Sequence, residues 1–155
     1  MIKVAINGFG RIGRRVFRLA LQHPQIEIVA INDLADSKTL SHVLKYDSIH
    51  GVSKSEISSD ISNIIVNDSK VPLSHHNHPR DINWQSYNID FVIECTGKFK
   101  TRELLHYHIK NGAKRVILSA PPVEEDIKTI VLGINDKHLL ELIEEIFKAQ
   151  GSFLL

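Results

Sequence analysis

The sequence predicts an α/β domain built on a doubly wound, mostly parallel sheet. Short apolar runs that end in polar residues alternate with amphipathic segments of helical length. The first unit places an apolar run at residues 2–6, an amphipathic segment at residues 11–22 and a second apolar run at residues 26–31. Strands and helices that alternate in this way are typical of a parallel sheet with helices on both faces.

The composition indicates one globular domain of ordinary polarity. The chain has 155 residues, 43% hydrophobic and 24% charged, which suffices for a single core. A net charge of +1 gives no electrostatic reason to expect nucleic acid or an anionic membrane surface as a partner. No apolar run approaches the roughly 18 residues of a membrane span. Because its single cysteine, Cys95, has no internal partner, we expect a cytoplasmic protein.

The first half of the chain contains two predicted helices and one interruption. The helix at residues 11–22 has an apolar stripe with arginines on its other face, and a second helix is expected at residues 37–46. Residues 47–78 are rich in serine, asparagine and glycine, so we expect small antiparallel strands laid onto the main sheet. Their turn is predicted at Asn67 and Asp68. The inward stripe of the first helix is predicted to comprise Ile12, Val16, Leu19 and Ala20.

The second half resumes the alternation of strands and helices. A strand at residues 89–94 precedes a helix at residues 101–110, which ends at Asn111 and Gly112. The remaining predicted elements are strands at residues 115–118 and 129–132 and an amphipathic helix at residues 138–150.

A glycine-rich turn follows the first strand, where residues 8–13 match the pattern G-x-G-x-x-G. In this pattern Gly8 allows a tight turn, Gly10 lets a pyrophosphate approach the backbone, and Gly13 lets the helix pack closely on the sheet. The helix N-terminus adds free N–H groups and a positive dipole end. The pattern predicts a dinucleotide site, and the alternative is a purely structural glycine turn.

An aspartate lies at the expected end of the second strand, twenty residues after Gly13. A carboxylate at Asp33 would accept hydrogen bonds from both hydroxyls of an adenosine ribose and would repel a 2′-phosphate. The neighbouring Leu34 offers no basic group to offset that repulsion. The sequence therefore predicts NAD rather than NADP, unless Asn32 and Asp33 only cap the following helix.

Five segments together resemble glyceraldehyde-3-phosphate dehydrogenase. They are V-A-I-N-G-F-G-R-I-G-R at residues 4–14, A-I-N-D at 30–33, Y-D-S-I-H-G at 46–51, E-C-T-G-K-F at 94–99 and G-A-K-R-V-I-L-S-A-P at 112–121. Their order and spacing match the family over residues 2–137. The resemblance implies a Rossmann sheet, NAD as cofactor and an oxidoreductase of glycolysis acting on an aldehyde.

The resemblance also implies roles for matching positions. The backbone amides of Arg11 and Ile12 would face the pyrophosphate, and Ser119 would lie near the nicotinamide ribose. The family's arginine-containing adenine loop is replaced here by residues 76–78, so the adenine contact would fall to the backbone carbonyl of Asn77. The implied cofactor-binding positions are Asn7, Gly8, Gly10, Arg11, Ile12, Gly13, Asp33, Asn77, Thr96, Gly97, Phe99 and Ser119.

No catalytic or metal-binding residue is assigned. The family's chemistry needs a cysteine nucleophile beside a histidine, and the block that carries that cysteine does not occur in these 155 residues. Cys95 stands where the family usually has serine, and we interpret it as a packed side chain. His50, His106 and His108 match no catalytic position. The loop histidines His75, His76 and His78 lack a nearby cysteine or spaced acid, so we expect them to be solvated.

We expect residues 1–155 to form a single NAD-binding Rossmann domain, with residues 1–137 like the family and 138–155 a divergent helical tail. The tail helix either packs on the domain or reflects a truncated or frame-shifted chain. The main hypothesis is a cofactor-binding domain that cannot turn over substrate alone, because the family's catalytic domain is missing. The alternatives are a non-enzymatic dinucleotide-binding or subunit-association module, self-associating or joining complete chains of the family, and the matching domain of erythrose-4-phosphate dehydrogenase.

Overall fold

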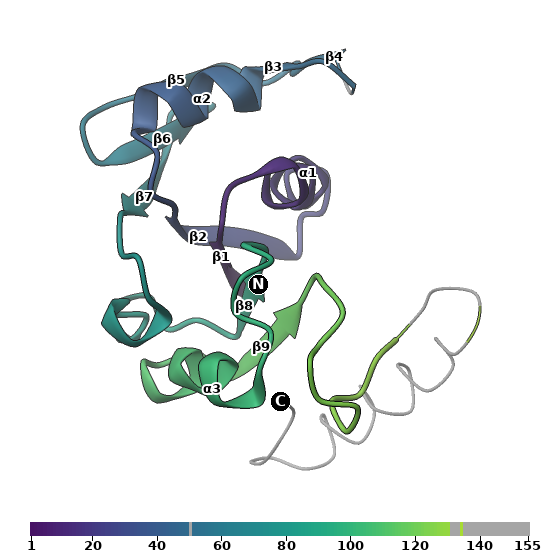
Figure 1. Ribbon diagram of the computed structural model, residues 1–155. Helices are drawn as coiled ribbons and strands as arrows, with labels where there is room; N and C mark the ends of the chain where they lie inside the picture. Colours follow the sequence, from purple (N-terminus) through teal and green to yellow (C-terminus); the bar gives the residue numbers. More distant parts are fainter. Residues whose placement is uncertain (50, 131–133, 135–155) are drawn as a thin grey trace.

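The computed structural model describes residues 1–49, 51–130 and 134. Its elements alternate as the sequence predicts (Figure 1). In chain order they are β1 (Ile2–Asn7), α1 (Arg11–Ala20), β2 (Ile26–Asn32), α2 (Ser37–Lys45), β3 (Tyr46–Asp47), β4 (Gly51–Val52), β5 (Ile57–Ser59), β6 (Asn63–Val66), β7 (Ser69–Ser74), the short 3₁₀ helices η1 (Pro79–Asp81) and η2 (Gln85–Tyr87), β8 (Phe91–Glu94), α3 (Arg102–Lys110) and β9 (Arg115–Leu118).

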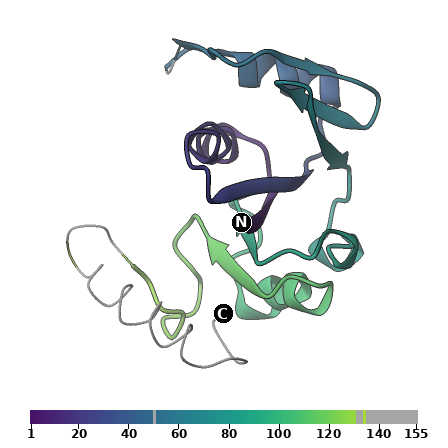
Figure 2. The same ribbon diagram turned by 180° about the vertical axis from the view of Figure 1, so that it is seen from behind.

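The main sheet is doubly wound about β1. Its strand order is β5-β6-β7-β2-β1-β8-β9, and β1 pairs in parallel with both β2 and β8. The helix α1 leads from β1 to β2 on one face, whereas α3 leads from β8 to β9 on the other (Figures 1 and 2). The predicted Rossmann-like α/β fold is confirmed. The direction of winding reverses at β1, and open sheets of this kind bind ligands beyond the carboxyl ends of the strands at such a point.

The antiparallel excursion extends the sheet instead of lying on it. Strands β6 and β7 form the expected hairpin, and the turn residues Asn67 and Asp68 have φ of 47° and 65°, the left-handed values of a tight hairpin turn. However, β7 also pairs in parallel with β2, through Ile31 with Leu73. The expected small antiparallel strands are confirmed, and they join the main sheet at its edge, because one edge of β7 pairs with β6 and the other with β2.

Two main apolar clusters lie on opposite faces of the sheet, as the alternation along β1 requires. Ile6 belongs to the cluster beneath α1 and α2, which also contains Phe17 and Leu44. Its neighbour Ala5 belongs to the cluster on the other face, with Trp84. A smaller cluster beside α3 contains Leu105, Val116 and Ile127.

Half of the predicted apolar stripe of α1 faces the core, because Ala20 is buried and Val16 packs against the first cluster. Ile12 and Leu19 are 53% and 41% exposed, whereas Gly13 and Phe17 are buried. The helix comes closest to the sheet at Gly13, where an added Cβ would lie 2.2 Å from the carbonyl oxygen of Gly8. This contact turns Phe17 into the core. The guanidinium of the partly buried Arg18 donates hydrogen bonds to the carbonyl oxygens of Leu44 and Lys45 at the end of α2.

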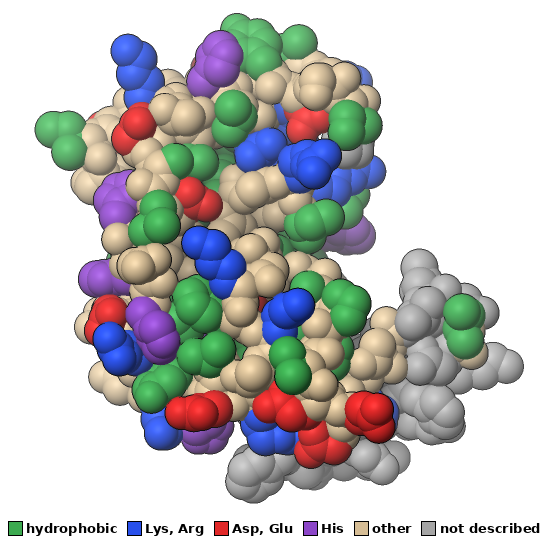
Figure 3. Space-filling model, in the orientation of Figure 1, with side chains coloured by type: hydrophobic (Ala, Val, Ile, Leu, Met, Phe, Trp, Pro, Cys, Tyr) green, Lys and Arg blue, Asp and Glu red, His purple; other side chains and the backbone are tan. Residues whose placement is uncertain are grey.

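The predicted bounds of the later strands differ from those in the structure. The strand predicted at residues 89–94 begins at Phe91. Thr129 and Ile130 lie outside any strand, while residues 131–132 of that predicted strand and the whole predicted helix at 138–150 fall outside the described residues. Within the described part of the chain, no helix is long and apolar enough to cross a membrane. On the face in Figure 3, acidic and basic side chains are interspersed, with acidic groups along the lower edge.

The close approach at Gly13 predicts that Gly13→Ala destabilises the folded protein by about 1–3 kcal/mol or more, because the added methyl group would meet backbone. Gly10→Ala is the matched control, since a Cβ at Gly10 has nothing within 4 Å. Its free energy of unfolding should stay within about 1 kcal/mol of the wild type. Urea unfolding measures both. Equal stability of the two variants would contradict the account of the helix contact.

Candidate functional site

A cavity of about 250 Å³ lies beyond the carboxyl ends of β1, β2 and β8. Seven of the twelve predicted positions line it: Asn7, Gly8, Gly10, Asp33, Asn77, Thr96 and Phe99. Asn32, Leu34, His76, Cys95 and Lys98 complete the lining and were not among the predicted positions. Three strand ends and the loop after β7 therefore meet at the place where the winding of the sheet reverses.

The other five predicted positions do not line this cavity. Arg11 and Ile12 open α1 directly after Gly10, and Gly13 lies at the contact between helix and sheet. Gly97 is exposed between two lining residues. Ser119 follows β9, where its backbone N–H donates to the carbonyl oxygen of Glu94 at 3.0 Å.

The glycine turn has the shape that its sequence predicts. Gly8 has φ of +91°, and a Cβ there would lie 2.7 Å from the backbone nitrogen of Thr96. Gly10, in contrast, faces open space and begins α1 without a side-chain cap. The first N–H groups of a helix need partners from outside the helix, and here no side chain of Gly10 occupies that place. The turn thus leaves room for an anionic ligand next to backbone.

Asp33 is held in position by two backbone amides. Its Oδ2 accepts a hydrogen bond from the Phe9 N–H at 2.6 Å, and its Oδ1 accepts one from the Ala35 N–H at 2.9 Å. A carboxylate offers about four acceptor positions, so about two remain for a ligand in the cavity. The Phe9 contact also ties the glycine turn to the end of β2. The carboxylate is oriented before any ligand arrives.

Buried asparagines join the strand ends. Asn32 donates to the Oδ1 of Asn7 at 2.8 Å and to the carbonyl oxygen of His76 at 2.9 Å, and it accepts from the His76 N–H at 2.9 Å. Ser74 adds a hydroxyl donor at 2.8 Å. These contacts fix the loop that carries Asn77 against β2. The sequence reasoning missed this role of Asn32, although a polar residue that ends an apolar strand was a usable signal.

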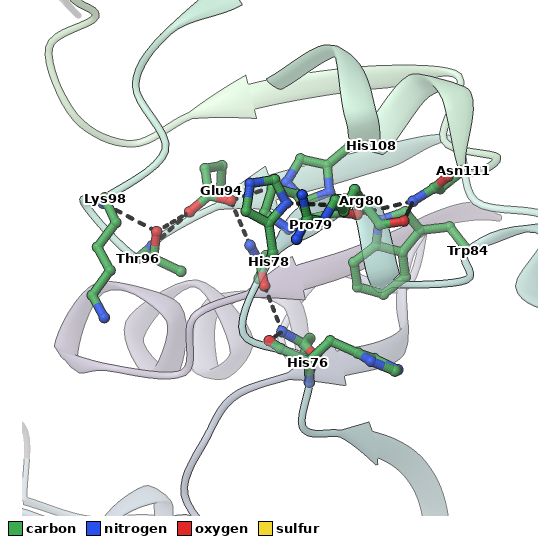
Figure 4. A network of polar contacts seen from close by, with 12 residues as sticks. His76, His78, Pro79, Arg80, Trp84, Glu94, Thr96, Lys98, His108 and Asn111 are labelled. Atoms are coloured by element: carbon green, nitrogen blue, oxygen red, sulfur yellow. Dashed lines mark hydrogen bonds and ion pairs between the residues drawn. The ribbon is translucent and has the colours of Figure 1, made fainter. Parts of the chain in front are cut away.

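A second buried network surrounds Glu94, which sequence reasoning also missed. Its carboxylate accepts from the Asn7 side-chain amide at 2.6 Å, from the Thr96 N–H at 2.8 Å and from the Thr96 hydroxyl. His108 Nε2 lies 3.0 Å from the same carboxylate, and Trp84 Nε1 donates to His108 Nδ1 at 3.0 Å. Figure 4 shows these contacts in a row from Trp84 to Thr96. The usable signal was a charged residue at the end of an apolar strand.

The histidines of the 75–78 loop have separate partners. The His75 ring contacts the carbonyl oxygen of Asp33 at 2.8 Å, and the His78 ring lies 5.6 Å from that of Phe99 and 5.5 Å from that of Tyr107. His78 therefore supports Phe99, which lines the cavity. Among the described residues, no group of three His, Cys, Asp or Glu side chains is placed to hold a metal ion.

This chain is similar to a known protein family. The model of the family described as "Glyceraldehyde 3-phosphate dehydrogenase, NAD binding domain" matches residues 2–102. Glyceraldehyde-3-phosphate dehydrogenase of Geobacillus stearothermophilus is 50% identical over 138 residues, which cover 88% of this chain and 41% of that protein. Glyceraldehyde-3-phosphate dehydrogenase 1 of Bacillus subtilis is 48% identical over 135 residues, 87% of this chain and 40% of that protein.

A relative from Thermotoga maritima, also named glyceraldehyde-3-phosphate dehydrogenase, is 45% identical over 141 residues, 90% of this chain and 42% of that protein. The chain thus spans about two fifths of the length of the relatives it matches. The family match includes the glycine turn, Asp33 and the Thr96 segment that meet at the cavity. The chain belongs to the family of glyceraldehyde 3-phosphate dehydrogenase NAD-binding domains.

Proposed function

We propose that this chain binds NAD in the cavity, with the pyrophosphate at the glycine turn and the adenosine ribose on Asp33. The placement of Asp33 carries the proposal: two backbone amides orient its carboxylate at the cavity, and about two acceptor positions stay free for two ribose hydroxyls. The apolar Leu34 and Phe99 line the same cavity and suit the flat adenine ring. Gly10 leaves the backbone open to a phosphate.

The proposed preference for NAD over NADP rests on charge. A 2′-phosphate would lie beside the Asp33 carboxylate, and like charges in close contact repel. Leu34, the next residue, supplies no positive charge. Bound NAD would supply the nicotinamide that accepts hydride, while the residues of this chain orient the dinucleotide and exclude its phosphorylated form.

The oxidoreductase activity toward an aldehyde is proposed for the whole protein, on the names of the relatives. The single cysteine of residues 1–155, Cys95, is a poor source of thiolate for it at neutral pH. Burial raises the pKa of the Cys95 thiol to about 11, the Glu94 carboxylate acts in the same direction, and a hydrogen bond with Ser119 partly offsets them. Because a protonated thiol is a poor nucleophile, Cys95 is not proposed as a catalytic residue.

We place the protein in the cytoplasm because it carries one unpaired cysteine.

Association with another chain is a second candidate function. Three exposed apolar side chains lie on the β3–β4 ribbon and in the turn after β3: Tyr46 is 49% exposed, Ile49 is 70% exposed and Val52 is 64% exposed. Neighbouring exposed apolar side chains favour an interface. A second copy or a complete chain of the same family is the partner we propose. Erythrose-4-phosphate dehydrogenase stays an alternative for the parent enzyme, because its N-terminal motifs resemble those of this chain as well.

The raised pKa of Cys95 predicts slow alkylation of the folded protein. At pH 7.5, iodoacetamide should modify the native chain about a hundredfold more slowly than the guanidinium-unfolded chain, because the thiolate is scarce in the folded state. The native rate should keep rising as the pH approaches about 11. Mass spectrometry of timed samples measures both rates. A native rate that already levels off below pH 9 would contradict this account of Cys95.

Isothermal titration calorimetry tests the proposed function. NAD should bind with one site per chain, and NADP should bind at least about tenfold more weakly. Asp33→Ala should weaken NAD binding by about 1–3 kcal/mol, the usual loss for a hydrogen bond to a charged group. Absence of NAD binding by the folded wild type would refute the proposal. Unchanged NAD affinity in Asp33→Ala would refute the role given to Asp33.

A further inference from the structure

The buried carboxylate of Glu94 lies behind the cavity and does not line it. It is 0% exposed, so it touches neither solvent nor a ligand in the cavity, and a role as a catalytic acid or base has no geometric basis. Yet two of its partners, Asn7 and Thr96, do line the cavity. A charged group buried this completely is costly unless its hydrogen bonds are made.

We propose that Glu94 is a positioning residue of the nucleotide site, which holds Asn7 and Thr96 in the orientation that NAD requires. This inference rests on the proposed binding of NAD. On the side of Glu94 away from the cavity, His108 contacts the carboxylate, and Trp84 in turn donates a hydrogen bond to His108.

The donors around Glu94 match the capacity of an ionised carboxylate. Such a group only accepts hydrogen bonds and offers about four positions. Asn7 and His108 share one carboxylate oxygen, while the backbone N–H and the hydroxyl of Thr96 share the other. Every position is therefore used by a group of the protein. The carboxylate acts as a fixed point between the end of β1, the end of β8 and α3.

Trp84 sets the direction of the contact with His108. The indole N–H only donates, so the Nδ1 of His108 must accept, and its Nε2 carries the hydrogen that points to Glu94. Trp84 and His108 are 1% and 0% exposed, so water does not compete for these bonds. The imidazole is thus held as a neutral donor to the carboxylate.

The Glu94 carboxylate affects the position of cavity residues through two chains of contacts, which we call routes. Because the amide nitrogen of Asn7 donates to Glu94, its oxygen faces Asn32, and Asn32 in turn holds the backbone of His76 beside Asn77. On the other route, Glu94 accepts hydrogen bonds from both the N–H and the hydroxyl of Thr96, and Gly8 packs against that N–H so closely that no Cβ would fit. One carboxylate therefore supports both the loop after β7 and the glycine turn.

The variant Glu94→Gln tests the proposal with little change in size. A glutamine replaces one acceptor oxygen by an NH₂ donor, so donors that shared that oxygen lose their acceptor. We expect the Kd for NAD, measured by calorimetry on folded protein, to rise about tenfold. Glu103→Gln is the matched control, because Glu103 is exposed on α3 and its loss removes the same charge. Its Kd should stay within about twofold of the wild type.

A double-mutant cycle separates positioning from stability. A merely structural Glu94 would lower the free energy of unfolding but leave the Kd of the folded fraction unchanged. If Glu94 acts through Thr96, the loss of affinity in Glu94→Gln combined with Thr96→Val should be smaller than the sum of the single losses. Strictly additive losses would overturn the proposed route through the Thr96 hydroxyl.

Two further variants keep the proposal testable if Glu94→Gln does not fold. His108→Gln retains a donor toward Glu94 and an acceptor for Trp84, whereas His108→Leu has neither. We expect His108→Leu to raise the Kd for NAD about threefold or more, and His108→Gln to stay near the wild type. Equal Kd values in both folded variants, or a folded Glu94→Gln that binds NAD like the wild type, would overturn the inference. Wild-type protein that binds no NAD would refute the proposed function instead.

Discussion

Parallel pairing of β1 with both β2 and β8 is the constraint on which the site depends. Three neighbouring strands that run in one direction must end at the same edge of the sheet. The helices α1 and α3, which follow β1 and β8, lie on opposite faces of the sheet, so the edge between them stays open. Residues far apart in the sequence, such as Gly8, Asp33 and Thr96, therefore line one cavity.

Polar groups at these strand ends are organised by one another rather than by solvent. Asn7, Asn32 and Glu94 are each at most 3% exposed, and all three make buried hydrogen bonds. Such groups are tolerated in a protein interior when their hydrogen bonds are made. The Asp33 carboxylate, oriented by the N–H groups of Phe9 and Ala35, keeps about two acceptor positions for a ligand. The polar groups behind the cavity are thus fixed by hydrogen bonds, while hydrogen-bond acceptors inside the cavity stay free for a ligand.

The parts of the site that sequence predicted are those that act locally. The glycine turn and Asp33 are separated by one strand–helix–strand unit, and the geometry of that unit is the same in any parallel sheet. The face of α1 was not predictable from hydrophobicity alone, because Gly13 decides which side approaches the sheet. The charged Glu94 at the end of the apolar strand β8 was a usable signal, but the partners of its carboxylate were not predictable. Its partners Trp84 and His108 lie on other elements, and only the folded chain brings them together.

The most direct test of the account is to map where NAD changes the protein. Amide resonances of the ¹⁵N-labelled chain, followed during a titration with NAD, report on each backbone N–H. We expect the largest shifts at the ends of β1, β2 and β8, notably at Phe9, Ala35 and Thr96. The N–H groups of Phe9 and Ala35 donate to the Asp33 carboxylate, and that of Thr96 donates to the Glu94 carboxylate. Shifts confined to the β5–β6 hairpin, or no shifts at saturating NAD, would contradict the account.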